Sequence, residues 1–461
     1  MPLPSELLAL RSGENFALHE RYLNAQMVRV LRAIGYDRRY VTARGPYLVD
    51  EDGNEYLDLL SGFGVFALGR NHPRVVAALQ DVLAHDWPDL VQLDASLLSG
   101  LLAERIVNLS PPGIDRVFFC NSGAEAVEAA IKFGRYATRR ETIVYCEHGF
   151  HGLTTGALSL NGERIFRAGF EPLLPKCASV PFDDLDALEQ ALSRRDVAAF
   201  IVEPIQGKGV NLPGDTYLPE AARLCAKYGT LFVADEIQTG LGRTGRFWAL
   251  DHWGVAPDMI LMAKSLSGGF IPVGAVAMRK HVMDAVFDRM DRAVVHGSTF
   301  SKNNMAMAAG LAALEVIEAE RLVENAALRG EQLVAALRAL PRTHEFLKEV
   351  RGRGLMIGLE FGAPQSLSLR AAWNLLEAAT KGLFCQMVAI PLFRDHRILT
   401  QVAGHGINVI KLLPPLVIDE RDVNRIVSAM AAVIADCHRI PGAVWDLGKT
   451  LAGHALKARA G

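Results

Sequence analysis

The sequence predicts an α/β fold with a mostly parallel central sheet covered by helices, a smaller α+β C-terminal domain and an N-terminal arm. Three observations support this prediction. Short apolar runs alternate with longer amphipathic segments, this pattern changes after about residue 315, and helical segments precede the first strand signals. We therefore expect an arm with a hairpin (1–70) that packs with the small domain, a large domain (71–315) and the small domain (316–461).

The predicted elements follow in chain order. The segment "DEDGN" at 50–54 predicts a hairpin turn. Apolar runs predict buried strands at 116–120, 142–146, 197–203, 230–236 and 259–263. Helical patterns such as "AEAVEAAIKFGRYA" (124–137) separate these strands. The connections are therefore right-handed crossovers, which place the carboxyl ends of the strands at one edge of the sheet, where ligands bind. Beyond residue 315, helical stretches lead to strand patterns at 351–361 and 407–418 and to a final helix.

The composition favours a small-molecule ligand. The 461 residues are 50% hydrophobic, and 49 Lys and Arg against 51 Asp and Glu give a formal net charge of -2. This balance predicts no nucleic-acid partner and no anionic membrane surface. The N-terminus does not resemble a secretory signal, and no apolar run has the length of a membrane span. The six cysteines are scattered without metal-binding spacing, so we expect reduced thiols, a cytoplasmic protein and no metal site.

One glycine motif suggests a dinucleotide and fails in its context. The segment "GLGRTG" (240–245) satisfies the pattern G-x-G-x-x-G. A dinucleotide loop starts immediately after a strand, opens a helix and has an acidic residue at the end of the next strand. Here several residues separate the strand from Gly240, no long helix pattern follows Gly245, and Asp258 precedes the next strand. A nicotinamide oxidoreductase is therefore the weaker hypothesis.

The residues at the strand ends indicate a different cofactor. Asp235 ends one strand, and Lys264 follows the next strand at the same edge. Pyridoxal 5'-phosphate needs a lysine for its Schiff base and an acid that keeps its ring nitrogen protonated. Desolvation would lower the pKa of Lys264 and make it nucleophilic, and the same amine can move a proton. The alternatives are a solvated loop lysine and an ordinary strand-end acid or helix N-cap at Asp235.

Three further segments converge on this edge. Ser122, Gly123 and Ala124 begin a helix, where free N–H groups and the helix dipole favour a phosphate. Helix capping by Ser122 or its neighbour Asn121 is compatible with that function. Phe150 follows another strand and offers a flat face for a pyridine ring, although a core aromatic is the plainer interpretation. Glu203 ends a further strand.

This ordered set resembles the class III, or ω-amino-acid, aminotransferases of PLP fold type I. The resemblance covers residues from about 20 to 437. Its motifs are "NSGAEAVEAAIK", "FHG", "VEPIQG", "ADEIQTGLGRTGRF", "DMILMAKSLSGGFIPVGA", "HGSTF" and "LLPPL". The segment "GFGVF", which contains Phe63, and the N-terminal arm are most similar to the putrescine and ornithine branch. The resemblance implies a ping-pong transfer of an amino group from a primary amine to an α-keto acid.

The resemblance also implies residue roles. Lys264 would form the Schiff base, Asp235 would pair with the ring nitrogen, and Gln238 would bind the ring hydroxyl. Phe150 and Ile237 would flank the ring. The implied cofactor-binding residues are Ser122, Gly123, Ala124, Phe150, His151, Glu203, Asp235, Ile237, Gln238, Lys264, Ser298 and Thr299. Thr299 would reach the phosphate in the neighbouring subunit, which implies a homodimer with shared sites and leaves a tetramer open.

The departures from the family pattern concern the substrate. Ornithine aminotransferases have an arginine where this chain has Leu153, another where it has Lys411, and a glutamate where it has Lys208. A lysine binds a carboxylate without the bidentate fork of arginine. The two lysines would repel each other on one wall, unless Lys208 points to solvent. Ser301 and Lys302 also replace the usual glycines.

These departures from the family pattern argue against ornithine as the amino-group donor. A putrescine-like diamine is the leading hypothesis, and a bulky or long-chain amine is the second. The alternatives are an ornithine or ω-amino-acid aminotransferase, and an aminomutase or decarboxylase on the same scaffold. Dependence on a keto acid separates an aminotransferase from a mutase, and the sequence does not choose between pyruvate and 2-oxoglutarate.

Overall fold

The computed structural model describes residues 2–340, 344–439 and 441–460 and is built around a seven-stranded sheet. The strands lie in the order β4 (Arg116–Cys120), β10 (Gly274–Met278), β9 (Met259–Met262), β8 (Leu231–Asp235), β7 (Val197–Val202), β5 (Thr142–Cys146) and β6 (Cys177–Val180). Strand β10 is antiparallel to both of its neighbours, and the other neighbouring pairs are parallel. The predicted α/β class with a mostly parallel sheet is confirmed.

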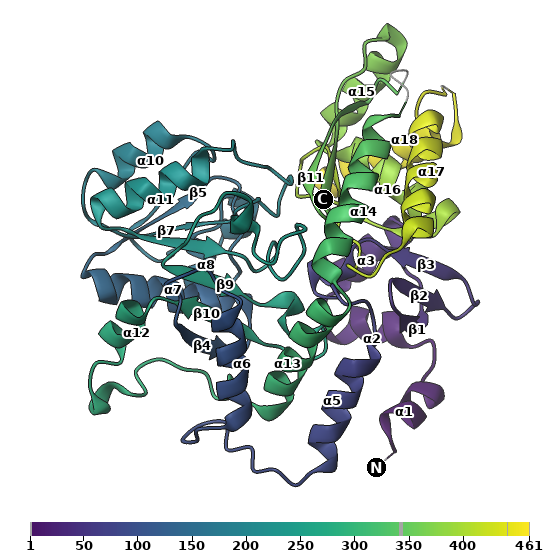
Figure 1. Ribbon diagram of the computed structural model, residues 1–461. Helices are drawn as coiled ribbons and strands as arrows, with labels where there is room; N and C mark the ends of the chain where they lie inside the picture. Colours follow the sequence, from purple (N-terminus) through teal and green to yellow (C-terminus); the bar gives the residue numbers. More distant parts are fainter. Residues whose placement is uncertain (1, 341–343, 440, 461) are drawn as a thin grey trace.

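Helices cover both faces of this sheet (Figure 1). Helix α7 (Gly123–Thr138) packs on one face together with α12 (Lys280–Val286). The opposite face carries α10 (Leu185–Leu192) and α11 (Tyr217–Tyr228). Alternate residues of one strand serve the two faces, since Ile143 is buried with α7 and Val144 with α11. Burial on both faces explains why these strands are continuous apolar runs.

Further helices extend this core. Helix α13 packs on α5 and α6, and α6 contacts β4. The remaining helices of this half are α5 (Pro73–Ala84), α6 (Leu97–Asn108), α8 (Thr155–Ser159), α9 (Arg164–Arg167) and α13 (Asn304–Ala319).

Two smaller sheets lie beside the large one. The N-terminal sheet has the order β1 (Tyr40–Arg44), β2 (Tyr47–Asp50), β3 (Glu55–Asp58) and β13 (Ile398–Leu399). The antiparallel pair of β2 and β3 confirms the hairpin predicted at 50–54. The other sheet has the order β11 (Leu347–Arg353), β12 (Met356–Phe361), β15 (Val409–Leu412) and β14 (Gln401–Val402). Strand β13 comes from the C-terminal part of the chain and pairs with β3. This sheet therefore contains strands from both the N-terminal and the C-terminal part.

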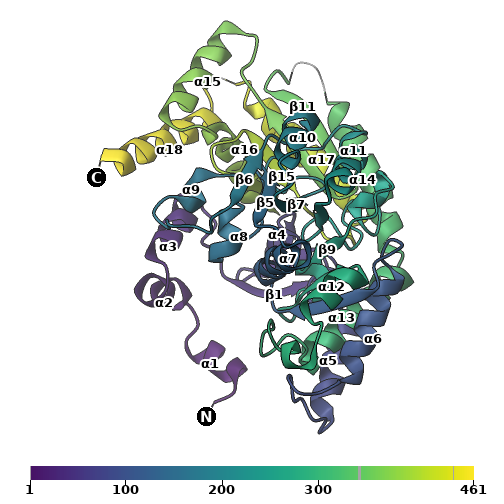
Figure 2. The ribbon, with the colours of Figure 1, turned by 90° about the vertical axis from the view of Figure 1, so that its left-hand side faces the viewer.

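The helices of the C-terminal part surround its sheet, and an arm extends from the N-terminal part. The C-terminal helices are α14 (Leu322–Arg338), α15 (Leu367–Ala379), α16 (Leu383–His396), α17 (Glu420–Asp436) and α18 (Ala443–Ala460). The arm contains α1 (Pro4–Leu10), α2 (Asn15–Tyr22) and α3 (Ala25–Ala33), and α1 and α2 stand apart from the helices around the large sheet (Figure 2). The domain boundaries proposed from the sequence stay a prediction.

The glycine-rich turn after β8 lies where the C-terminal part packs on the large sheet. Gly245 has a φ of +79°, and a Cβ there would lie 2.9 Å from the Cα of Ala327 in α14. Arg243 is buried and donates hydrogen bonds to the carbonyls of Leu355 and Pro414. The close neighbours of Gly242 and Gly245 are therefore residues of α14 and the C-terminal part.

Within the described ranges, no single helix combines the length and apolar composition needed to cross a membrane. The bent pair α15 and α16, at 99°, meets these criteria only when the two helices are taken together.

Candidate active site

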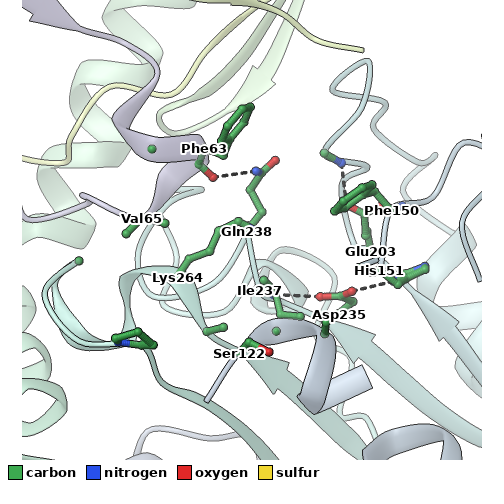
Figure 3. Close-up of a pocket in the computed structure, with 18 of the residues that line it drawn as sticks. Phe63, Val65, Ser122, Phe150, His151, Glu203, Asp235, Ile237, Gln238 and Lys264 are labelled. Carbon is green, nitrogen blue, oxygen red and sulfur yellow. Dashed lines mark hydrogen bonds and ion pairs between the residues drawn. The ribbon is translucent and has the colours of Figure 1, made fainter. Parts of the chain in front are cut away.

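A cavity of about 740 Å³ opens at the carboxyl edge of the large sheet. It brings together most of the residues that the sequence predicted. Those that line it are Phe63, Ser122, Gly123, Ala124, Phe150, His151, Glu203, Lys208, Asp235, Ile237, Gln238, Lys264 and Lys411. Figure 3 shows Lys264 between Ser122 and Ile237 on one side and Phe63 and Gln238 on the other.

An acid and a histidine form a buried pair at the base of the cavity. Asp235 is 3% exposed, and its Oδ2 lies 2.6 Å from Nδ1 of His151. Its Oδ1 accepts a hydrogen bond from the N–H of Ile237 at 3.1 Å. Burial alone would lower the pKa of His151, but the hydrogen bond and charge of Asp235, together with the charge of Glu203, raise it above its ordinary value. The histidine thus holds the carboxylate of Asp235 in place where it lines the cavity.

Lys264 begins a short 3-10 helix, Lys264–Ser267, two residues beyond the end of β9. Its φ of +43° lies in the left-handed region, which residues other than glycine adopt only when the surrounding structure stabilises it. Burial lowers the pKa of its amine, although the charges of Asp235 and Glu203 oppose this shift. A lowered pKa increases the fraction of neutral, nucleophilic amine at neutral pH.

The N-terminus of α7 points at the same cavity. Ser122 is the N-cap, and its Oγ accepts a hydrogen bond from the N–H of Glu125 at 3.2 Å. The capping function considered for Ser122 is therefore present. The first helical N–H groups, those of Gly123 and Ala124, have no acceptor within the helix. They are oriented to bind an anion, and the helix dipole favours one there.

Glu203 and Phe150 form the next part of the wall. The carboxylate of Glu203 accepts hydrogen bonds from the N–H groups of Phe150 at 2.9 Å and Gly207 at 2.8 Å. Burial raises the pKa of Glu203. The ring of Phe150 meets the ring of Phe166 edge to face at a centroid distance of 5.7 Å. Glu203 therefore orients the backbone that carries Phe150.

The two lysines of the sequence analysis both line the cavity. The Nζ of Lys411 donates to the carbonyl of Gly207 at 2.7 Å and to Oε1 of Gln238 at 3.2 Å. Gln238 also donates to the carbonyl of Phe63 at 2.8 Å (Figure 3). The Nζ of Lys208 lies 3.8 Å from the ring centroid of Phe166 and does not point freely into solvent. Gln238 thus links three parts of the site, including the segment of Phe63.

Three predicted site residues lie outside the cavity lining. Leu153 is 58% exposed. Ser298 and Thr299 belong to a surface segment whose carbonyls accept hydrogen bonds from Gln92. Lys302, for which the sequence gave no role, donates to the carbonyl of Asp94 at 3.4 Å. The role of Leu153 in substrate selection therefore stays a prediction.

Two features of the site were missed by sequence reasoning. Phe166 comes from α9, a four-residue helix in a stretch without clear periodicity, and its place on the wall depends on tertiary packing. The pairing of His151 with Asp235 joins segments 84 positions apart. The sequence showed that His151 and Asp235 each lie near the end of a strand, but it did not show that their side chains are in contact.

The donor set of the cavity fits pyridoxal 5'-phosphate. A carboxylate is available for a ring nitrogen, an amine with a lowered pKa for an aldehyde, and helix N–H groups for a phosphate. Gly123 keeps this space open, since a Cβ at that position would lie 2.9 Å from Cδ1 of Ile237. Metal-ligand clusters of three or more His, Cys, Asp or Glu residues are absent from the residues that the structure describes.

Comparisons with known proteins agree with this geometry. The family model for class III aminotransferases matches residues 33–434. Aminotransferase PigE of Serratia sp. is 36% identical over 447 residues, which cover 90% of this chain and 52% of that protein. The chain thus spans about half the length of PigE. Ornithine aminotransferase of Bacillus cereus is 38% identical over 402 residues, which cover 85% of this chain and 93% of that protein.

A solved structure shows the same architecture. The ornithine aminotransferase of Toxoplasma gondii, whose structure has partial occupancy of PLP at the active site, superimposes with a TM-score of 0.82 at 31% identity. The match covers 95% of this chain and 100% of that chain. With the family model and these relatives, the chain belongs to the class III aminotransferases, enzymes that depend on pyridoxal 5'-phosphate.

Proposed function

We propose that this aminotransferase moves an amino group from a primary amine with an apolar body to an α-keto acid. One observation carries the choice of donor. Glu203 and Asp235 are the only carboxylates among the described residues that line the cavity, and both already accept hydrogen bonds from the protein. A second ammonium group of a diamine would meet Lys208 and Lys411 instead of a free carboxylate. This favours the bulky or long-chain amine over the putrescine-like diamine.

The walls of the cavity suit such a donor. Aromatic rings from three separate segments, those of Phe63, Phe150 and Phe166, face the space above Lys264 and Asp235. Contact with these rings would bury apolar surface of the donor, which contributes about 25 cal/mol of binding free energy per Å² of buried surface. The keto acid carries a carboxylate, and Lys411 supplies a charge for it at the same cavity.

We assign the following roles to the residues of the chain. When bound, pyridoxal 5'-phosphate supplies an aldehyde for the amino group and a ring that withdraws electrons from the carbon that loses its proton. Lys264 would hold the aldehyde carbon, and its amine would move the proton at the donor Cα. Asp235 holds the proton on the ring nitrogen, and His151 orients Asp235 through Nδ1. The N–H groups of Gly123 and Ala124 bind the phosphate.

The named relatives support a second donor. Two of the compared proteins are ornithine aminotransferases, and ornithine carries a carboxylate that Lys411 is placed to bind. Half-reaction spectroscopy separates the hypotheses. The enzyme loaded with pyridoxal 5'-phosphate is mixed with a long-chain amine, putrescine or ornithine, and the loss of the visible absorption band is timed. We expect the long-chain amine to react fastest, and a faster reaction with putrescine or ornithine contradicts this choice.

We further propose a homodimer with shared active sites. Thr299 lies outside the cavity of its own chain, as a residue that serves the partner's site must. An exposed apolar surface adjoins it. We call it the 90s surface, and it consists of Leu90, Leu93, Leu97, Val294 and Phe300. Contiguous exposed apolar residues of this kind mark interaction sites. The six free cysteines, five of them buried, support a reducing compartment such as the cytoplasm.

A further inference from the structure

Lys208 carries a buried charge without a hydrogen-bond partner. Its Nζ lies over the rings of Phe166 and Phe150, at 3.8 and 5.0 Å from their centroids. Among the described residues it has no hydrogen-bond acceptor, although the atom is buried. Aromatic faces attract a cation, but they do not replace the hydrogen bonds that an ammonium group loses on burial. An anion that enters the cavity would supply them.

Lys411 is only partly satisfied. Its Nζ donates to two neutral acceptors, the carbonyl of Gly207 and the side chain of Gln238. An ammonium group has three N–H donors, so one remains for a ligand, and neutral acceptors leave its charge uncompensated. Gly207 directly precedes Lys208, so the loop after β7 connects the two lysines.

Among the described residues, no carboxylate forms a direct contact with the ammonium group of either lysine. Glu203 is held by the N–H groups of Phe150 and Gly207, and Asp235 by His151 and the N–H of Ile237. Glu163, from the segment before α9, has its Oε1 at 2.8 Å from Nδ1 of His148. The cavity therefore holds these two lysines and no free carboxylate among its described lining residues.

We infer that Lys208 and Lys411 together select a keto acid with two carboxylates as the amino-group acceptor, and that Lys208 binds the carboxylate remote from the keto group. A dianion compensates both charges, whereas a monocarboxylate leaves one lysine unpaired. The rings of Phe166 and Phe150 hold the ammonium of Lys208 in place and pack against the methylene groups between the two carboxylates. This inference rests on the proposed function, because it assigns the acceptor of the same site.

Equilibrium binding tests the inference without turnover. Glutarate and butyrate, a dicarboxylate and a monocarboxylate, are titrated calorimetrically into the enzyme loaded with pyridoxal 5'-phosphate. We expect glutarate to bind about 10- to 100-fold more tightly than butyrate, as for one added charge-assisted hydrogen bond. Lys208→Met should lose this difference, Lys208→Arg should retain it, and Lys280→Met, on the exposed face of α12, should not change it.

The acceptor half-reaction gives a second readout. The enzyme carrying pyridoxamine 5'-phosphate is mixed with 2-oxoglutarate or pyruvate, and the rate of cofactor conversion is measured. Lys208→Met should slow the reaction with 2-oxoglutarate more than the reaction with pyruvate, and Lys208→Arg should keep the wild-type ratio of the two rates.

Three results would overturn the inference. They are equal affinity of the wild type for glutarate and butyrate, an equal effect of Lys208→Met on both ligands, and no effect on either. The wild-type ratio decides even where the variant does not fold. A wild type that reacts with no amine contradicts the proposed function instead, and the glutarate titration still tests the two lysines.

Discussion

At the scale of single residues, the Asp235 carboxylate is almost fully buried, and the protein supplies a hydrogen-bond partner for each of its two oxygens. Nδ1 of His151 and the N–H of Ile237 lie at 2.6 and 3.1 Å from its two oxygens. Each oxygen retains a lone pair for a further hydrogen bond. The same pair of contacts fixes the direction of the carboxylate, so a ring nitrogen at the cavity meets a preorganised negative charge.

Replacement of Asp235 tests that charge. In Asp235→Asn the side chain keeps its shape but no longer stabilises a proton on the ring nitrogen, so we expect turnover to fall by roughly 10²- to 10⁴-fold. The matched control is Asp196→Asn, an exposed acid that precedes β7 at the opposite edge of the sheet. Steady-state kinetics of both variants check the prediction. Near-wild-type turnover of Asp235→Asn would remove this residue from the mechanism.

Lys411 predicts a pH dependence of keto-acid binding. Burial, and next the charge of Lys264, lowers the pKa of Lys411 to about 7. A lysine binds a carboxylate as a charge only while it is protonated, and its protonated fraction falls as the pH rises through about 7. We therefore expect KM for the keto acid to rise roughly tenfold between about pH 7 and about pH 8.5.

The control for this prediction is Lys411→Arg. An arginine stays protonated throughout this range, so the KM of this variant should rise much less with pH. The rise that remains comes from Lys208, because burial lowers its pKa to about 8. Initial rates at several pH values, with the donor held at saturation, give both profiles. If the two enzymes show the same slope, another group is responsible and Lys411 does not bind the carboxylate.

At the scale of elements, the turn at 240–245 is shaped by packing between parts of the chain. Gly354, in the turn between β11 and β12, packs against the backbone of this turn. A Cβ at position 354 would lie only 2.3 Å from the carbonyl carbon of Thr244, so no larger residue fits there. Gly245 faces α14 in the same way, and Arg243 reaches across to two carbonyls. The motif that suggests a dinucleotide is thus explained by close backbone approach.

A pair of alanine substitutions separates backbone strain from packing at this turn. Gly245 and Gly254 both have a positive φ, +79° and +64° respectively. A Cβ at position 245 would have neighbours within 4 Å, whereas a Cβ at position 254 would have none. Gly254→Ala should cost about 1 kcal/mol for its left-handed backbone. Gly245→Ala should cost about 1–3 kcal/mol more, because α14 must move. Denaturant unfolding of the two variants measures the difference, and equal losses would contradict the packing argument.

The sequence predicted the elements that carry a strong pattern. The five predicted strands match β4, β5, β7, β8 and β9 within a residue or two at their ends. Strands β6 and β10 were missed, because "CASV" is short and "GAVAM" is rich in Gly and Ala, which have low β propensity. Lys264 and Asp235 were found because a strand end fixes where they lie. Phe166 was missed, since packing between segments places it on the cavity wall.

At the scale of the whole molecule, the surface segments 86–101 and 290–303 lie together. Gln92 donates to the carbonyls of Ser298 and Thr299, and Lys302 donates to the carbonyl of Asp94. These contacts bring together the two segments that carry the exposed apolar side chains of the 90s surface. Leu93 is 93% exposed, which is an unfavourable arrangement for an isolated chain and a reasonable one for an interface.

This surface predicts the oligomeric state. Sedimentation of the wild type should give a dimer, because association removes the 90s surface from water. The double substitution Leu93→Asp and Val294→Asp should shift the molecule towards monomer. The control Leu375→Asp, at an exposed position on α15, should leave the dimer intact. A wild type that sediments as a monomer, or an equal effect of the control, would contradict the proposed interface.

The central claim is that Lys264 binds the cofactor covalently at this cavity. The enzyme loaded with pyridoxal 5'-phosphate is reduced with sodium borohydride, digested, and its peptides are weighed by mass spectrometry. We predict that the cofactor remains attached to the peptide containing Lys264, and that Lys264→Ala carries no attached cofactor and has lost turnover, whereas Lys280→Ala behaves as the wild type. Attachment to another lysine, or substantial transamination by Lys264→Ala, would contradict the account.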